Sequence, residues 1–118
     1  MTKKNVAYEK SYQFAVRIVK SYQFLTKEKK EFVLSKQLLR SGTSIGANLA
    51  EANGAISKAD FSNKISIAYK ECLETKYWLS LLKDTHFIDE TTFESIYAAA
   101  DEIAKILFTT LKTSRINK

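Results

Sequence analysis

The chain of 118 residues contains no proline and only three glycines. These two residues form most of the tight turns that connect β-strands, so their scarcity disfavours a sheet protein. Long stretches without a helix breaker instead favour a few long α-helices. We therefore predict an all-α fold in one domain, residues 1–118, a length that suits a single hydrophobic core.

The first helix is expected from about Val6 to Lys27, because apolar and small residues recur there at steps of three and four. That face carries Ala7, Ser11, Phe14, Ile18, Tyr22 and Leu25. The charged stretch 27–31 follows as the first connection. A second helix is expected from about Val33 to Ala52, and Asn53–Gly54 predicts its end in a left-handed C-cap conformation.

The third helix shows the clearest period, with Ser57 and Asp60 resembling a capping box at its start and an end expected near Lys83–His86. Its core stripe is Phe61, Ile65, Ala68, Cys72, Thr75, Leu79 and Leu82. Alternating steps of four and three are typical of helices that pack in bundles.

The fourth helix is expected to begin after Asp89, a favourable N-cap residue. Its first stripe is Phe93, Ile96, Ala100, Ile103, Leu107 and Thr110, and a second stripe beside it is Tyr97, Ala104, Phe108 and Leu111. One stripe suffices for a bundle core, so the second indicates either a subunit interface or a wide core face. Four long helices with short connections favour an up-down-up-down four-helix bundle.

The segment 41–50 carries no charge, and within it Gly42, Gly46 and Ala50 lie four residues apart. Glycine inside a helix costs about 1 kcal/mol relative to alanine. We therefore expect the backbone of another helix to approach this side closely.

A second face of the same helix is polar and could meet Glu71, Glu74 and Trp78 of the third helix at matching spacing. The predicted network comprises Arg40, Ser44, Asn48, Glu51 and Glu74. In this interpretation Arg40 pairs with a carboxylate and Asn48 bridges the polar groups, so that the network is satisfied inside the bundle. The alternative is a solvated polar stripe.

Catalytic and metal chemistry finds little support in the residues. The single histidine, His86, lies in an expected connection and lacks the Glu-x-x-His spacing of di-metal bundles. Cys72 falls on a core stripe, where a structural thiol is expected rather than a nucleophile. We predict no enzyme activity, no metal and no cofactor.

Charge is distributed unevenly, because residues 1–40 carry ten Lys or Arg against three Glu, whereas residues 41–118 carry nine against ten acids. A basic first third favours a polyanionic partner, RNA or DNA. The predicted phosphate contacts are Lys10, Arg17, Lys20, Lys27, Lys29 and Lys30. A protein–protein scaffold without a nucleic-acid role is the alternative. One cysteine, a charged start and no membrane-length apolar run favour a cytoplasmic protein.

Residues 37–51 resemble the central pattern of the four-helix-bundle family named for proteins encoded in 23S rRNA intervening sequences. The pattern is Gln-Leu-x-Arg, a small residue, then Ser-Ile-x-x-Asn-Leu-Ala-Glu, which stands here from Gln37 to Glu51. The following part is also similar, at Ser57, Phe61, Ile67–Ala68 and Leu73–Thr75. Ala52 departs from the glycine common in the family, and Glu71–Cys72 replaces residues that are more often small and polar.

The resemblance implies an up-down bundle that assembles into a ring-like homo-oligomer, commonly a homopentamer, with no assigned enzymatic activity. An accessory variability protein of diversity-generating retroelements is similar in architecture and binds nucleic acid and a reverse transcriptase. By analogy, the resemblance favours a scaffold that binds nucleic acid, although a shared fold does not establish a shared function.

Overall fold

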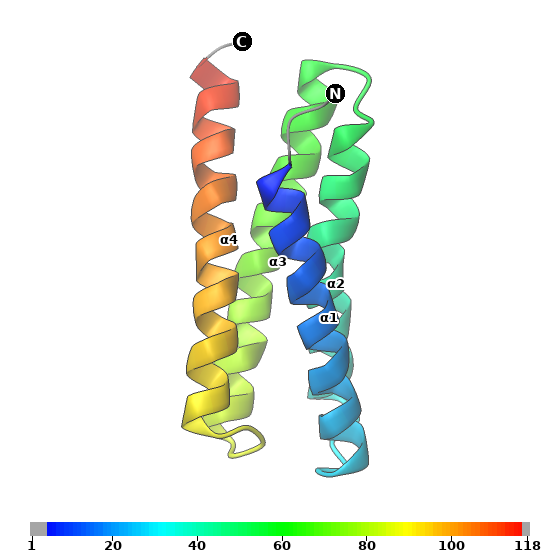
Figure 1. The fold of residues 1–118 in the computed structure, drawn as a ribbon, viewed down its shortest axis with the longest axis vertical. Helices are drawn as coiled ribbons and strands as arrows, with labels where there is room; N and C mark the ends of the chain where they lie inside the picture. Colours follow the sequence, from blue (N-terminus) through cyan, green and yellow to red (C-terminus); the bar gives the residue numbers. More distant parts are fainter. Residues whose placement is uncertain (1–4, 117–118) are drawn as a thin grey trace.

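Four antiparallel helices follow one another along the chain in the computed structural model, which describes the backbone of residues 5–116 and the side chains of residues 5–114 (Figure 1). They are α1 (Val6–Lys27), α2 (Leu34–Asn53), α3 (Lys58–Asp84) and α4 (Glu90–Ile116). The chain runs down, up, down and up through the bundle. The predicted all-α bundle is confirmed, and the expected helix ends lie within a few residues of the observed ones.

In three of the four helices, the residue that directly precedes the helix caps it with its side chain. The Ser57 hydroxyl accepts a hydrogen bond from the Asp60 N–H at 3.0 Å, and the Asp89 carboxylate accepts one from the Thr92 N–H at 2.7 Å. Both caps confirm the sequence prediction. Asn5 caps α1 in the same way by accepting from the Tyr8 N–H at 3.0 Å.

The end of α2 differs from the prediction. Gly54 has a φ of −104°, so the helix does not end in a left-handed residue. Its N–H instead bonds to the Glu51 carbonyl at 3.0 Å, and this tight last turn closes the helix without a change of handedness. Among residues 5–116, a left-handed backbone conformation occurs at Lys30 (φ 54°) and His86 (φ 69°). Each lies in a connection at the end of the bundle opposite to Gly54.

The core is formed by the predicted stripes. Six of the seven stripe residues of α3 are buried and Phe61 is half-buried. On α1, Ser11, Phe14, Ile18 and Leu25 are buried. Burying such a continuous apolar seam is the main force that holds the helices together, at about 25 cal/mol per Å² of apolar surface.

The glycines of α2 allow α1 to approach closely, as predicted. A Cβ atom on Gly42 would lie 2.8 Å from two carbons of the Ile18 side chain, and one on Gly46 would lie 3.5 Å from the Ser11 carbonyl oxygen. Ala50 does not take part, because it is exposed. A helix turns by 100° per residue, so Ala50, eight residues after Gly42, is rotated 80° away from Gly42 around the helix axis. This rotation turns Ala50 away from α1.

The second stripe of α4 is divided between the core and the surface. Ala104 and Leu111 are buried, Tyr97 is half-buried, and Phe108 is exposed. The ring of Phe108 lies against Tyr69 of α3, with the ring centroids 5.8 Å apart. The stripe thus widens the core face and leaves one large aromatic side chain at the surface.

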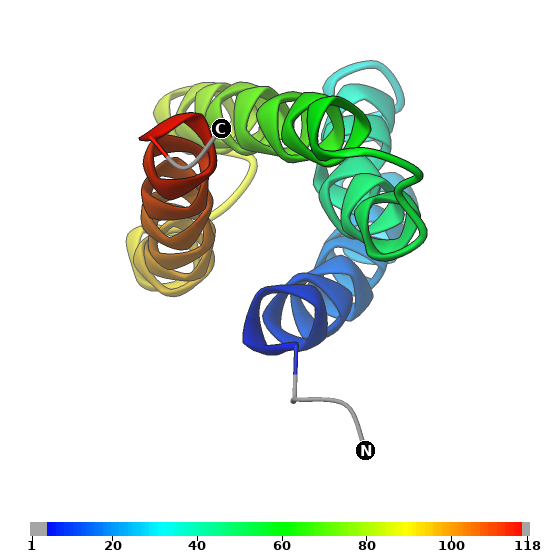
Figure 2. The same cartoon turned by 90° about the horizontal axis from the view of Figure 1, so that it is seen from above.

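The four helices form a horseshoe in cross-section (Figure 2). Each of α2 and α3 packs along both of its neighbours, whereas α1 and α4 make the sparsest contact of the four neighbouring pairs. None of the helices among residues 5–116 is long and apolar enough to cross a membrane.

Candidate nucleic-acid interface

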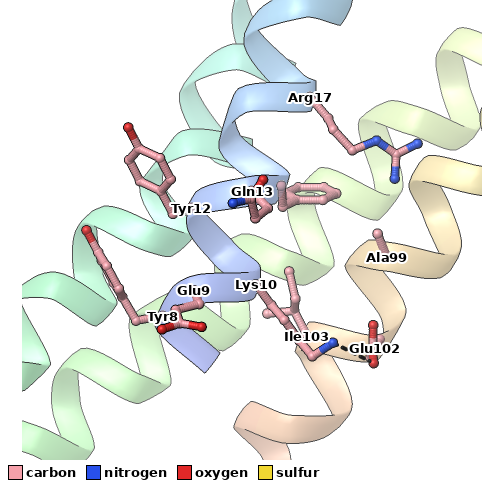
Figure 3. Close-up of a pocket in the computed structure, with 10 residues that line it drawn as sticks. Tyr8, Glu9, Lys10, Tyr12, Gln13, Arg17, Ala99, Glu102 and Ile103 are labelled. Atoms are coloured by element: carbon pink, nitrogen blue, oxygen red, sulfur yellow. Dashed lines mark ion pairs between the residues drawn. The ribbon is translucent and has the colours of Figure 1, made fainter. Parts of the chain in front are cut away.

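Two of the six predicted phosphate contacts lie between α1 and α4. The Lys10 ammonium is 3.2 Å from a carboxylate oxygen of Glu102, and the Arg17 guanidinium donates a hydrogen bond to the Ser95 hydroxyl at 2.7 Å (Figure 3). Both cations therefore reach across the opening of the horseshoe to α4. Each of these two cations therefore already has a polar partner within the protein.

These cations border a groove of about 620 Å³ between α1 and α4. Its wall includes the aromatic rings of Tyr8 and Phe14 and the aliphatic side chains of Ala99 and Ile103. In Figure 3, Lys10 points from α1 toward Glu102 of α4. The polar contacts thus link α1 and α4, the neighbouring helices with the sparsest contact, along a groove that Glu9 and Gln13 also line.

The other four predicted residues lie at the end of the bundle where α1 meets α2. Lys20 and Lys27 are exposed on the last turns of α1, and Lys29 and Lys30 are exposed in the connection. Lys36, in the first turn of α2, is an exposed neighbour that the sequence prediction missed. We call Lys20, Lys27, Lys29, Lys30 and Lys36 the basic end. None of its ammonium groups pairs directly with a carboxylate in the described part of the chain.

The acid Glu31 in this connection caps α2. Its carboxylate accepts hydrogen bonds from the N–H groups of Leu34 at 3.0 Å and Ser35 at 2.7 Å, and a longer one from Val33 at 3.2 Å. Partial burial raises the pKa of Glu31, but these backbone bonds outweigh burial, so its pKa lies below the ordinary value. The negative charge is therefore directed at the positive end of the α2 dipole. Glu28 remains exposed nearby.

A pocket of about 520 Å³ opens beside the basic end, between α1 and the α3–α4 connection. The positively charged Lys20 and Lys29 line it together with His86, and the rings of Phe24 and Phe87 supply apolar walls. The acid at its edge, Asp89, caps α4, and its pKa is lowered chiefly by the Thr92 backbone N–H. The sequence prediction did not single out Phe24, although its position four residues after Lys20 is a usable signal.

The predicted polar network separates into distinct groups. Arg40 forms ion pairs with Glu71, at 3.5 Å, and with Glu74, and the Trp78 indole N–H donates to the same Glu74 carboxylate at 3.0 Å. The predicted pairing between α2 and α3 is therefore present. The Arg40 side chain is 49% exposed, so these ion pairs lie at the surface rather than in the core.

Asn48 and Glu51 do not join these ion pairs. The Asn48 amide donates to the carbonyl and hydroxyl oxygens of Ser44, one turn earlier in its own helix, at 2.9 and 3.0 Å. Glu51 forms an ion pair with Lys64 at 2.7 Å. The expectation of a single buried network bridged by Asn48 is therefore wrong. The buried polar link between α2 and α3 is the 3.0 Å hydrogen bond from the Thr75 hydroxyl to the Ser41 hydroxyl, which the sequence prediction missed.

Two groups of exposed apolar residues lie on different helix pairs. The outer face of α1 and α2 exposes Tyr12, Val16 and Val19 together with Ala47 and Ala50. We call these five residues the α1–α2 face. The α3–α4 face consists of the exposed Leu73, Tyr77 and Phe108 and the half-buried Tyr69.

Cys72 occupies a core position, as predicted. The thiol is buried, and this burial, with a smaller contribution from Glu71 and against the effect of Lys76, raises its pKa to about 12. A thiol with such a pKa stays protonated near neutral pH and is a poor nucleophile. Across residues 5–114, no three His, Cys, Asp or Glu side chains are grouped as metal ligands would be.

Comparisons with known proteins agree with the architecture. The family model described as 23S rRNA-intervening sequence protein matches residues 3–109. A crystal structure from Bacteroides thetaiotaomicron, of a protein with unknown function from the S23 ribosomal protein family, is 56% identical with a TM-score of 0.90. The similarity covers 91% of this chain and 99% of that one. A comparison with curated proteins gave no match. The helical bundle with the Gln37–Glu51 pattern on α2 therefore belongs to the family of 23S rRNA-intervening sequence proteins.

Proposed function

We propose that this protein is a non-enzymatic, self-assembling helical bundle whose basic end binds nucleic acid. The observation that carries the proposal is that five exposed lysines gather at one end of the bundle, none of them in a direct ion pair with a carboxylate among the described residues. Glu31, an acid of the α1–α2 connection, accepts hydrogen bonds from three backbone N–H groups at the start of α2. Exposed, unpaired ammonium groups at one site attract a polyanion.

Contacts of this kind bind phosphates and do not read base sequence. Each neutralised phosphate releases counterions, so the logarithm of the binding constant falls linearly with the logarithm of salt concentration. Five lysine–phosphate contacts correspond to a slope of about −3.5 on a single strand and about −4.5 on a duplex. Lys10 and Arg17 contribute less in this proposal, because each already contacts a polar group of α4.

Self-assembly is supported by the exposed apolar residues of the α1–α2 face and of the α3–α4 face. Because the α1–α2 face and the α3–α4 face differ in their residues, contact between them joins subunits head to tail, and such an assembly forms a ring when the rotation between subunits closes. A pentameric ring is what the family resemblance implies. A ring presents the basic end several times, and such repetition strengthens binding to a long polyanion.

The test is an electrophoretic mobility-shift titration of RNA and DNA oligonucleotides at about 50 to 200 mM salt. The charge-reversed variant Lys27→Glu/Lys30→Glu should lose most of the binding and show a shallower salt slope. Lys58→Glu/Lys70→Glu is the matched control, since it changes net charge equally at exposed lysines of α3. Absence of a shift at the lowest salt, or equal loss in both variants, would refute the proposed site.

A protein–protein scaffold is the second candidate, and the α3–α4 face favours it. Leu73, Tyr77 and Phe108 together expose three large apolar side chains, and exposed apolar patches are common at protein contacts. If the partner is another protein, replacing the lysines of the basic end leaves its binding unchanged. A Phe108→Glu variant should then abolish binding.

A further inference from the structure

We propose that the pocket at the basic end receives one unpaired base, so that the protein prefers single-stranded to double-stranded nucleic acid. The inference rests on the proposed nucleic-acid function and specifies its substrate class. It comes from the juxtaposition of an exposed aromatic ring, Phe24, with ammonium groups in one cavity. Lysine-rich surfaces alone would bind either form.

Phe24 is the residue that distinguishes this pocket from a simple basic surface. Its side chain is 45% exposed although it lies on a helix with a large buried face. Within the pocket, Phe24 on α1 lines one side, and Phe87 and Ile88 from the α3–α4 connection line the other. An exposed ring beside apolar side chains offers a base a stacking surface and a partly dry environment.

Two lysines lie beside this ring, and the acid of the pocket, Asp89, accepts a hydrogen bond from the Thr92 N–H at the start of α4. The Lys29 ammonium lies 5.8 Å from the centroid of the Phe24 ring, and Lys20 precedes Phe24 by one helical turn. A base stacked on Phe24 therefore brings its own phosphate within reach of two ammonium groups. This pairing of an aromatic ring with backbone-binding cations is how proteins hold single strands without sequence preference.

The pocket offers little to an intact duplex. In a double helix each base is paired and stacked, so entering a pocket requires it to leave the stack at a cost of a few kcal/mol. A single strand has unstacked bases at much lower cost.

The experiment measures fluorescence-anisotropy binding of labelled oligouridylate, oligothymidylate and a mixed-sequence DNA duplex at one salt concentration. The wild-type protein should bind both single strands more tightly than the duplex. Phe24→Leu should weaken single-strand binding about tenfold and leave duplex binding unchanged, because leucine keeps the apolar bulk but cannot stack. Phe24→Tyr should restore single-strand binding.

Phe32→Ala is the matched control, since Phe32 is an exposed phenylalanine in the neighbouring connection that does not line the pocket. It should bind single strands as the wild type does. Thermal melting by circular dichroism confirms that each variant is folded. If single strand and duplex bind equally and Phe24→Leu changes neither, the pocket inference is overturned while the lysine-dependent function stands. Absence of binding at low salt overturns both.

Discussion

Two glycines of α2 differ in the space that surrounds them. At Gly42 a new methyl group would lie 2.8 Å from the Ile18 side chain, which is fully buried and branched at Cβ. Overpacking costs about 1–3 kcal/mol, whereas alanine gains about 1 kcal/mol of helix propensity. We therefore expect Gly42→Ala to lower the free energy of unfolding by up to about 2 kcal/mol in urea denaturation.

Gly46→Ala is the matched variant on the same helix face. Its methyl group would lie 3.5 Å from the Ser11 carbonyl oxygen, an ordinary contact distance. The helix-propensity gain then decides the outcome, and we expect unchanged stability or a gain of up to about 1 kcal/mol. Equal effects at both positions would mean that α1 does not approach α2 as described.

The Asn48 side chain bonds only within its own helix, at the Ser44 carbonyl and hydroxyl oxygens. Asn48→Leu therefore breaks no link between α2 and α3, and leucine has the higher helix propensity. We expect the free energy of unfolding to change by less than about 1 kcal/mol, measured from the urea midpoint. A loss of about 3 kcal/mol or more would instead show that Asn48 bridges to buried partners.

At the scale of the element, Glu31 holds the start of α2, where Val33 supplies no side-chain cap. Removing the carboxylate in Glu31→Ala leaves three backbone N–H groups without their acceptor. We expect the free energy of unfolding at neutral pH to fall by about 1–2 kcal/mol in denaturant titrations. Glu28→Ala, at an exposed neighbouring acid, should have little effect.

The same cap predicts a pH dependence. Because the folded-state pKa of Glu31 lies below its ordinary value of 4.5, its stabilisation is fully present above that pH and is lost as the pH falls through the folded-state pKa. The stability difference between wild type and Glu31→Ala should therefore shrink on acidification below about pH 4. A difference that persists undiminished at pH 2 would show that the charge of Glu31 plays no part.

Most helix boundaries follow from local chemistry, which is why they were predictable. Ser57 and Asp89 cap the helices that follow them through hydrogen bonds to residues only three positions away. The end of α2 was not predicted correctly in its conformation, because Gly54 permits a left-handed backbone but does not require it. Lys30 and His86, which do adopt that conformation, are held there by connections whose shape depends on the packing of two helices.

At the scale of the whole molecule, the α1–α2 face and the α3–α4 face differ in their residues, and this difference predicts the behaviour of mixed variants. Val16→Glu disables the α1–α2 face and Phe108→Glu the α3–α4 face, and each substitution places a charge at an exposed position. If subunits join head to tail, either variant alone should be a monomer of 13.4 kDa by light scattering. Mixing the two should give a dimer, because one intact pair of faces remains. A monomeric wild type would contradict the assembly.

The sequence by itself determined the four helices, their core stripes and the close approach at Gly42, because these depend on helical periodicity and residue size.

Only the tertiary structure decided which polar side chains meet. Lys10 reaches Glu102 and Arg17 reaches Ser95, whereas Asn48 stays within α2. The same packing brings Phe24 of α1 and His86 of the α3–α4 connection to one pocket. Periodicity places a side chain on a face, but only the rotation and axial shift of packed helices bring distant residues into contact.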